Sequence, residues 1–279
     1  MKIRLNIKRT ITLSLLGLLV IIVSATLILR EHYVVPILMY HSISEDSPDK
    51  DNLLAISADT FNRQMEFLQT RKYNVISLKE LARLMREDAP LPHNTVVITF
   101  DDGYQDNFTV VFPIIKKYDI PITIFICPML ISEEEQYLTW PQVKKLSDSS
   151  LVDIGSHTLN HTFLPDLKGR EESLIMQISG SKEILEDILK VPIDSFSYPA
   201  GGFNKNIRRI VEESGYRVAV ATKPGLDYPD DDIFALKRLR ISEHNKNMFI
   251  FWVKLTGLYT KVREWQRKDK DKDLKINYE

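Results

Sequence analysis

The ten residues Thr95-Val-Val-Ile-Thr-Phe-Asp-Asp-Gly-Tyr104 combine a structural signal with a chemical one. Residues 95–100 are all apolar or β-branched, a pattern typical of a strand buried on both faces of a parallel sheet. Asp101 and Asp102 follow directly, and Gly103 provides a turn. Residues 104–118 carry apolar side chains at helical spacing. The two carboxylates are therefore predicted to lie in a strand-to-helix loop, where α/β folds hold catalytic groups.

A second string, Ser156-His-Thr-Leu-Asn-His161, follows a short predicted strand at 151–155. Taken alone, Asp-Asp-Gly is an ordinary turn sequence, and two histidines four residues apart often just lie on a solvent-exposed face. Because both strings end parallel strands, we expect them to meet at one face of the fold, which favours a functional site. Two imidazoles and one carboxylate make a three-ligand set for a divalent metal, and the spare carboxylate is placed to act as a general base.

Strands and helices alternate through most of the chain. Strands are predicted at 34–39, 95–100, 121–127, 151–155, 195–198, 216–221 and 234–241, and helices at 58–71, 77–86, 104–118 and 171–190, with another from residue 204. Such alternation predicts a parallel, barrel-like α/β fold. With 279 residues, of which 44% are hydrophobic, the chain can form one sizeable domain. A net charge of -1 gives no argument for a nucleic-acid partner, and the single Cys127 excludes an internal disulfide.

The amino terminus predicts export. Four basic residues within the first nine precede an uncharged stretch at 10–29, long enough for a transmembrane helix. The basic flank is expected to stay in the cytoplasm, with the rest of the chain outside the cell. Cleavage near Ala25 would instead release a secreted domain, but the apolar run continues to Leu29, which favours a single-pass anchor. The predicted organisation is an anchor at 1–30, a catalytic domain at 31–257 and a charged, mobile tail at 258–279.

The two strings, followed by Phe196-Ser-Tyr-Pro-Ala-Gly-Gly202, resemble the first three motifs of the polysaccharide deacetylases, the family 4 carbohydrate esterases. The resemblance extends over about residues 34–245. It implies a distorted (β/α) barrel that removes acetyl groups from N-acetylglucosamine units of a polysaccharide. It also implies one divalent metal ion, commonly zinc, although this ligand set also suits cobalt, nickel, manganese or iron.

Residue by residue, the resemblance makes Asp101 the general base and Asp102, His157 and His161 the metal ligands. By the same similarity, the backbone N–H of Tyr104 stabilises the oxyanion that develops as the acetamide is attacked. The third motif, with Tyr198, Pro199 and Gly201, is expected to shape the sugar-binding groove.

The sequence departs from the commonest family pattern in its general acid. No convincing Leu-x-His string follows the third motif, and His244 is only a fallback. Instead, Pro36-Ile-Leu-Met-Tyr-His41 ends the first predicted strand, as in a circularly permuted barrel, and it resembles the matching segment of poly-N-acetylglucosamine deacetylases. His41 is thus predicted to be the general acid, because imidazole titrates near neutrality. The alternative is a polar core histidine at a strand end.

The family arginine that orients the catalytic aspartate is also missing, since its place reads Ser197-Tyr-Pro199. Arg238 and Arg240, on a later predicted strand, are candidates to replace it, although either could pair outside the site. Trp140 could stack on a sugar, but a tryptophan in an amphipathic segment more often serves packing.

Deacetylation of exported poly-N-acetylglucosamine has three alternatives. Peptidoglycan is the alternative polymer. A phosphoesterase would usually need further carboxylates to bridge two metals, and no such cluster accompanies the motifs. A catalytically inactive carbohydrate-binding relative would be expected to have lost Asp101 or one of the three ligands, and all four are present.

Overall fold

The protein is described here by a computed structural model, which covers residues 12–13, 15–17, 34–46, 48, 52–92, 94–222, 232–243, 246–257 and 259. Its centre is a sheet in which every pairing of neighbouring strands is parallel. The sheet closes into a barrel in the order β1 (Ile37–Tyr40), β5 (Thr95–Phe100), β6 (Ile122–Ile126), β7 (Val152–Ser156), β8 (Ser195–Ser197), β9 (Val218–Ala221) and β10 (Leu236–Arg240). The prediction of a parallel α/β barrel is therefore confirmed.

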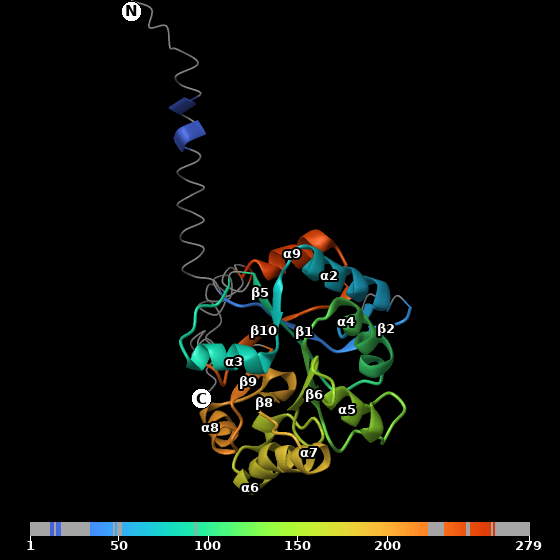
Figure 1. Ribbon diagram of the computed structural model, residues 1–279. Coiled ribbons are helices and arrows are strands. Elements are labelled where there is room, and N and C mark those ends of the chain that lie inside the picture. The colour runs from blue at the N-terminus through green and yellow to red at the C-terminus, as the bar shows by residue number, and fades with distance from the viewer. Residues whose placement is uncertain are drawn as a thin grey trace, which may run out of the picture.

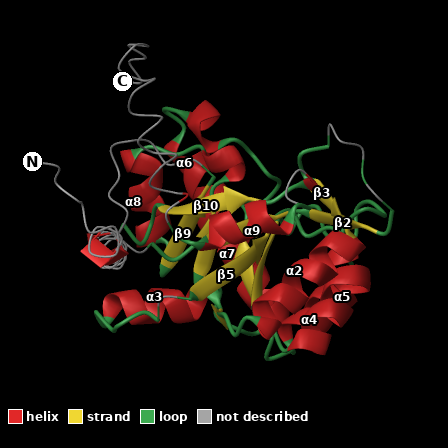
Figure 2. Ribbon diagram, turned by 90° about the horizontal axis from the view of Figure 1, so that it is seen from above, coloured by secondary structure: helices red, strands yellow, loops and turns green. Residues whose placement is uncertain are grey.

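The barrel closes through β1, which pairs with β10 on one edge and with β5 on the other (Figure 1). The first strand of the chain thus lies between the last strand and the one that carries the two aspartates. A short strand, β4 (Asn74–Ile76), pairs with the first half of β5 outside this ring. Two more, β2 (Ser42–Ser44) and β3 (Ala55–Ser57), form a separate small parallel sheet beside the barrel (Figure 2).

Helices surround the barrel (Figure 1). They are α2 (Ala58–Thr70), α3 (Leu78–Arg86), α4 (Phe112–Tyr118), α5 (Trp140–Ser147), α6 (Glu171–Ile175), α7 (Ser181–Leu189), α8 (Lys205–Glu213) and α9 (Met248–Leu255). Ser57, Ser77 and Asn204 cap α2, α3 and α8 by accepting a hydrogen bond from a backbone N–H of the first turn. These caps lie within one residue of the predicted helix starts at 58, 77 and 204.

Two predicted helices are less regular than expected. The helix predicted at 104–118 begins with a π-helical turn, η1 (Asn107–Val111), that leads into α4. The helix predicted at 171–190 contains a second π-helical turn, η3 (Met176–Gly180), between α6 and α7. Short 3₁₀ turns, η2 (Leu164–Leu167) and η4 (Pro199–Gly201), occur in the connections. Single π-helical turns are often found at functional sites, and η1 directly follows the aspartate loop.

The inside of the barrel is apolar at its floor and polar towards its mouth. Ile37, Val97 and Leu236 belong to one buried cluster, which α3 closes with Leu78 and Leu81. Closer to the carboxyl ends of the strands, the buried side chains that meet across the barrel are polar, and they include Thr99, Ser197 and Arg238. Since side chains two residues apart on a strand point the same way, positions 97, 99 and 101 lead from the floor to the mouth.

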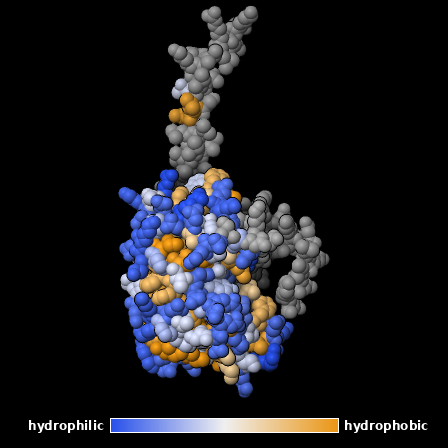
Figure 3. Space-filling model, turned by 90° about the vertical axis from the view of Figure 1, so that its right-hand side faces the viewer, coloured by the Kyte–Doolittle hydropathy of each residue, from blue (hydrophilic) through white to orange (hydrophobic). Residues whose placement is uncertain are grey.

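The surface seen in Figure 3 is mainly hydrophilic, with separate apolar areas. The predicted anchor at 10–29 lies mostly outside the described residues. Among the residues that are described, no helix is long and apolar enough to cross a membrane. His244 and the tail at 261–279 also lie outside the described part of the chain.

Candidate active site

The polar residues of the sequence motifs meet at the mouth of the barrel, because the carboxyl ends of parallel strands share one end. Asp101 and Asp102 follow β5, and His157 and His161 follow β7. The strand ladder continues into both loops, since Asp101 N donates to Tyr40 O at 3.0 Å and His157 N donates to Ile126 O at 2.9 Å. The backbone therefore fixes where each loop begins.

Asp102, His157 and His161 form a compact ligand set. The Oδ1 atom of Asp102 lies 3.6 Å from His157 Nε2 and 3.5 Å from His161 Nε2, and the three candidate ligand atoms lie within 4.8 Å of one another. Tetrahedral bonds of about 2.0–2.1 Å place ligand atoms roughly 3.4 Å apart, so the donor set fits a zinc-like divalent ion. His161 is 43% exposed, which leaves the set open on its side.

Hydrogen bonding orients the buried ligand His157. Its Nδ1 atom lies 2.7 Å from the backbone oxygen of Ser197, so Nδ1 carries the proton and donates it to that carbonyl. The Nε2 lone pair then faces Asp102. The backbones of Asp102, Thr158 and His161 all have positive φ, at 73°, 65° and 62°. Such left-handed conformations are strained for residues other than glycine, and they cluster at functional sites.

Arg238 binds the other aspartate, Asp101, with both ends of its guanidinium group. Nη1 donates to Oδ1 at 2.7 Å, and Nη2 donates to Oδ2 at 2.6 Å. The same group donates to Ser197 Oγ and Thr99 Oγ1, at 2.9 and 3.2 Å. Burial alone would raise the pKa of Asp101, but the charge and hydrogen bonds of Arg238, together with the neighbouring His157 and His41, outweigh it and hold that pKa well below its usual range. Asp101 is therefore ionised and firmly oriented, and Arg238 occupies the role that the third motif leaves empty.

His41 faces the same aspartate from β1. Its Nε2 atom lies 4.0 Å from Asp101 Oδ2, and His157 Nε2 lies 3.9 Å from that oxygen. Burial lowers the pKa of His41 to about 4; Asp101 opposes this shift, and the charges of Arg238 and Arg240 add to it. The imidazole is therefore neutral at neutral pH in the resting site. Arg238 is thus the arginine that contacts Asp101, and Arg240 contributes only its charge to the lowered pKa of His41.

Tyr104 lies at the start of the helix-forming segment, next to the ligands. Its backbone N–H donates no hydrogen bond within the described part of the chain, which leaves it available to a ligand. Its ring stacks on Tyr137, with ring centroids 5.6 Å apart. Burial and the neighbouring Asp102 carboxylate raise the pKa of the Tyr104 hydroxyl, so it stays protonated.

The third motif lies differently from the groove that its resemblance implies. Tyr198 is fully buried, and its hydroxyl donates to the backbone oxygen of Phe234 at 3.0 Å. Pro199 is also buried, while Gly201 is partly exposed with φ at 75°. The Tyr198 side chain therefore supports the loop from the core and does not line a groove. Trp140 is partly buried and packs against the main core, in agreement with a packing role.

Sequence reasoning missed several residues around the site. Thr99 and Ser197 share the guanidinium of Arg238, and buried Asn107 donates to the backbone oxygen of His41 at 3.1 Å. Phe163, two residues after a ligand, is 42% exposed beside Gly202. Thr99 was a usable signal, because it is a polar residue two positions before Asp101 and its side chain therefore points to the same side of the strand.

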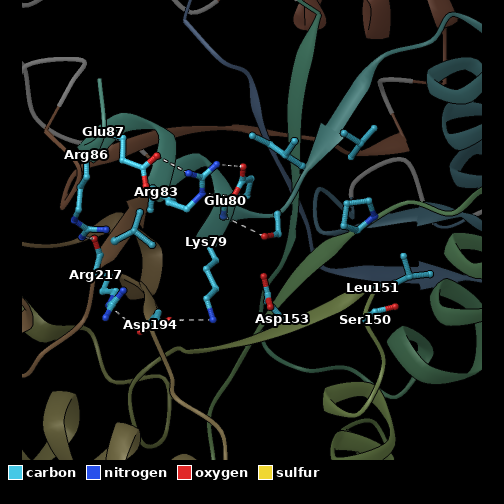
Figure 4. A pocket seen from close by; sticks show the side chains of 16 residues that line it. Lys79, Glu80, Arg83, Arg86, Glu87, Ser150, Leu151, Asp153, Asp194 and Arg217 are labelled. Carbon is cyan, nitrogen blue, oxygen red and sulfur yellow. Dashed lines mark hydrogen bonds and ion pairs between the residues drawn. The ribbon is translucent and has the colours of Figure 1, made fainter. Parts of the chain in front are cut away.

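A separate hollow of about 610 Å³ lies at the opposite end of the barrel, between α3 and the amino ends of the strands (Figure 4). Its charges largely pair with each other: Lys79 and Arg217 both contact Asp194, and Arg83 contacts Glu80. Of the described residues, only the three ligands at the mouth form a group that could hold a metal ion. The chemistry therefore belongs to the mouth.

Comparisons with known proteins agree with this geometry. A family model for polysaccharide deacetylase matches residues 88–219. YxkH of Bacillus subtilis (strain 168), which is named for the polysaccharide deacetylases, is 32% identical over 207 residues, or 74% of this chain and 71% of its own length. The poly-beta-1,6-N-acetyl-D-glucosamine N-deacetylase of Staphylococcus aureus (strain MSSA476) is 23% identical over 199 residues, 68% of each chain. The structure of the Streptococcus pyogenes deacetylase PplD in complex with acetate superposes with a TM-score of 0.68 at 28% identity, covering 75% of this chain and 93% of that one.

Proposed function

We propose a substrate and a mechanism on the premise that this chain belongs to the polysaccharide deacetylase family, whose members hydrolyse N-acetyl amide bonds. The substrate is an extracellular polysaccharide that contains N-acetylglucosamine, and poly-N-acetylglucosamine is the favoured polymer. This choice is supported by the location of His41 directly after the first barrel strand and by the similarity to a poly-beta-1,6-N-acetyl-D-glucosamine N-deacetylase.

One observation carries the mechanism: a three-residue ligand set lies beside an aspartate that is not part of it and that an arginine orients. Asp102, His157 and His161 would hold the divalent ion. When bound there, such an ion would polarise the acetyl carbonyl and lower the pKa of a water ligand. The four motif residues thereby divide into three that bind and one, Asp101, that accepts a proton.

Asp101 removes a proton from the water that attacks the acetamide carbon. Arg238 keeps the carboxylate in place during this transfer through its two hydrogen bonds. The new C–O bond converts the carbonyl oxygen into an oxyanion, and the unused backbone N–H of Tyr104 is the donor that this chain offers to it.

His41 protonates the sugar nitrogen as the amide C–N bond breaks, so that the products are a free amine and acetic acid, which then ionises to acetate. The resting imidazole is neutral, and it must therefore gain a proton during the reaction. Asp101 supplies this proton. The carboxylate takes a proton from the attacking water and passes it on to His41, whose Nε2 atom lies 4.0 Å from Asp101 Oδ2. The attacking water thus provides the proton that the leaving amine needs.

We further propose that the domain is exported and held at the outer face of the cell membrane by the hydrophobic segment at 10–29. The support for this location is the sequence pattern. Release after cleavage near Ala25 is the alternative.

The test of the mechanism is Asp101→Asn, which removes the base but none of the ligands. We expect the variant to bind the metal and to release acetate from N-acetylglucosamine oligomers about 10²–10⁴-fold more slowly than the wild type. Asp153→Asn is the control, because Asp153 lies in the hollow at the other end of the barrel. Unchanged acetate release in Asp101→Asn would refute the assignment. Mass spectrometry of the products from poly-N-acetylglucosamine and from peptidoglycan then decides the polymer.

A further inference from the structure

Two side chains at the start of η1 tie the aspartate loop to the segment that carries His41. Asn107 is fully buried, and its Nδ2 group donates to His41 O at 3.1 Å and to Asp106 Oδ1 at 2.7 Å. The other oxygen of Asp106 accepts a hydrogen bond from Ser42 Oγ at 2.5 Å. A continuous set of hydrogen bonds thus joins residues that are about 65 positions apart in the chain.

The His41 side chain has few contacts of its own that would fix it. Its buried Nδ1 atom has no hydrogen-bond partner among the described residues, and its Nε2 atom is 4.0 Å from Asp101, beyond hydrogen-bond distance. The position of the imidazole therefore depends on its backbone. That backbone is held before His41 by Asp101 N, which donates to Tyr40 O, and at His41 by Asn107.

We propose that Asp106 and Asn107 are positioning residues for proton delivery, which hold His41 at the distance from Asp101 that transfer to the leaving amine requires. Asn107 holds the backbone oxygen of His41, Asp106 holds the hydroxyl of Ser42, and neither residue belongs to the ligand set. This inference rests on the proposed role of His41 as general acid. In this barrel the general acid comes from the first strand, and the two residues attach that strand to the loop that carries the base.

The geometry explains why a π-helical turn follows the aspartate loop. A π-helical turn contains one residue more than an α-helical turn and changes the direction in which its first side chains point. Here Asn107 opens η1 and points to β1, and η1 packs against β2. The irregular turn therefore coincides with the contact between the two catalytic segments.

The test compares two substrates that differ in their need for an acid. An amine leaving from N-acetylglucosamine oligomers must be protonated, whereas the phenolate that leaves from 4-nitrophenyl acetate needs no proton. A displacement of about 1 Å at a reacting group can cost about 10²-fold in rate. For Asp106→Ala and Asn107→Ala we expect amide hydrolysis to fall about 10–100-fold while ester hydrolysis stays within about threefold of wild type.

Three controls define the outcomes. Asp106→Asn keeps an acceptor oxygen for Ser42 and should recover most of the amide activity. His41→Asn should show the same selective loss as the two alanine variants, and Asp106→Ala should cost little more in the His41→Asn background. Metal content and the unfolding midpoint are measured for each variant.

Equal losses of ester and amide hydrolysis, or no loss of either, in Asp106→Ala and Asn107→Ala would overturn the positioning role. If His41→Asn itself shows no selective loss, the proposed acid fails instead. If the wild type releases no acetate from the oligomers, the proposed function fails. The three failures are therefore distinguishable.

Discussion

The pair formed by Arg238 and Asp101 allows a quantitative prediction. Both side chains are almost fully buried, and two hydrogen bonds of 2.7 and 2.6 Å join them. Arg238→Met keeps most of the side-chain volume but leaves a buried carboxylate without its countercharge. Breaking one side of a buried ion pair costs about 3–5 kcal/mol, and we expect a loss of this size in the free energy of unfolding at pH 7. Replacing both partners, in Arg238→Met with Asp101→Asn, should cost much less than the sum of the single changes, with a coupling of about 2–4 kcal/mol.

The measurement is urea unfolding of the full-length, chelated protein in mild detergent. The matched control is Arg208→Met, because Arg208 also binds a carboxylate, Asp232, at 2.7 Å from two nitrogens. That pair is partly exposed, with 26% of the Arg208 side chain accessible, so its removal should cost no more than about 1 kcal/mol. A loss below about 1 kcal/mol in Arg238→Met, or simple additivity in the double variant, would refute the reasoning.

Two further predictions concern His41 and Gly155. Burial lowers the pKa of His41 from 6.5 to about 4, so the fold favours the neutral ring. The stability that the neutral ring contributes is present above pH 6.5 and is lost as the pH falls towards 4. Between these pH values the free energy of unfolding of the chelated wild type should fall by up to about 3 kcal/mol more than that of His41→Asn. Parallel stability curves of the two proteins in urea unfolding would contradict this. In Gly155→Ala the new Cβ would meet Phe125 and Ser195 Oγ at 2.5 Å, so we expect a loss of about 1–3 kcal/mol in the same assay, and unchanged stability would show that β7 can shift.

The fold could be predicted wherever one local pattern dominated. Residues 95–100 form β5 with the predicted bounds, because a continuous apolar and β-branched run is stable as a strand that is buried on both faces of a parallel sheet. The helix starts predicted at residues 58, 77 and 204 also lie within one residue of the observed starts. The short strands β2, β3 and β4 were missed, since three residues are too few to show a period. The π-helical turns were missed because they depend on packing between elements, η1 against β2 and η3 against α8, and not on local preference.

At the site, sequence could name residue types but not their partners. The motif pattern led to the three ligands and to Asp101, and the structure brings these four together. Arg238 and Arg240 lie two residues apart on one strand, so sequence alone did not separate them; the structure puts Arg238 on Asp101. Sequence also did not show that the Tyr198 side chain points into the core, because a single motif does not reveal which face of the loop is exposed; its part in shaping the sugar groove stays a prediction.

Acetate release from poly-N-acetylglucosamine, measured while the chelated protein is titrated with zinc, tests the central claim most directly. We expect no acetate release from the chelated protein and a rise in release that saturates at one bound ion per chain. His157→Ala should abolish both the binding and the rise, because it removes a ligand that lies 3.6 Å from Asp102 Oδ1. Full activity in the chelated protein, or equal activity in His157→Ala, would contradict a metal-dependent deacetylase built on these residues.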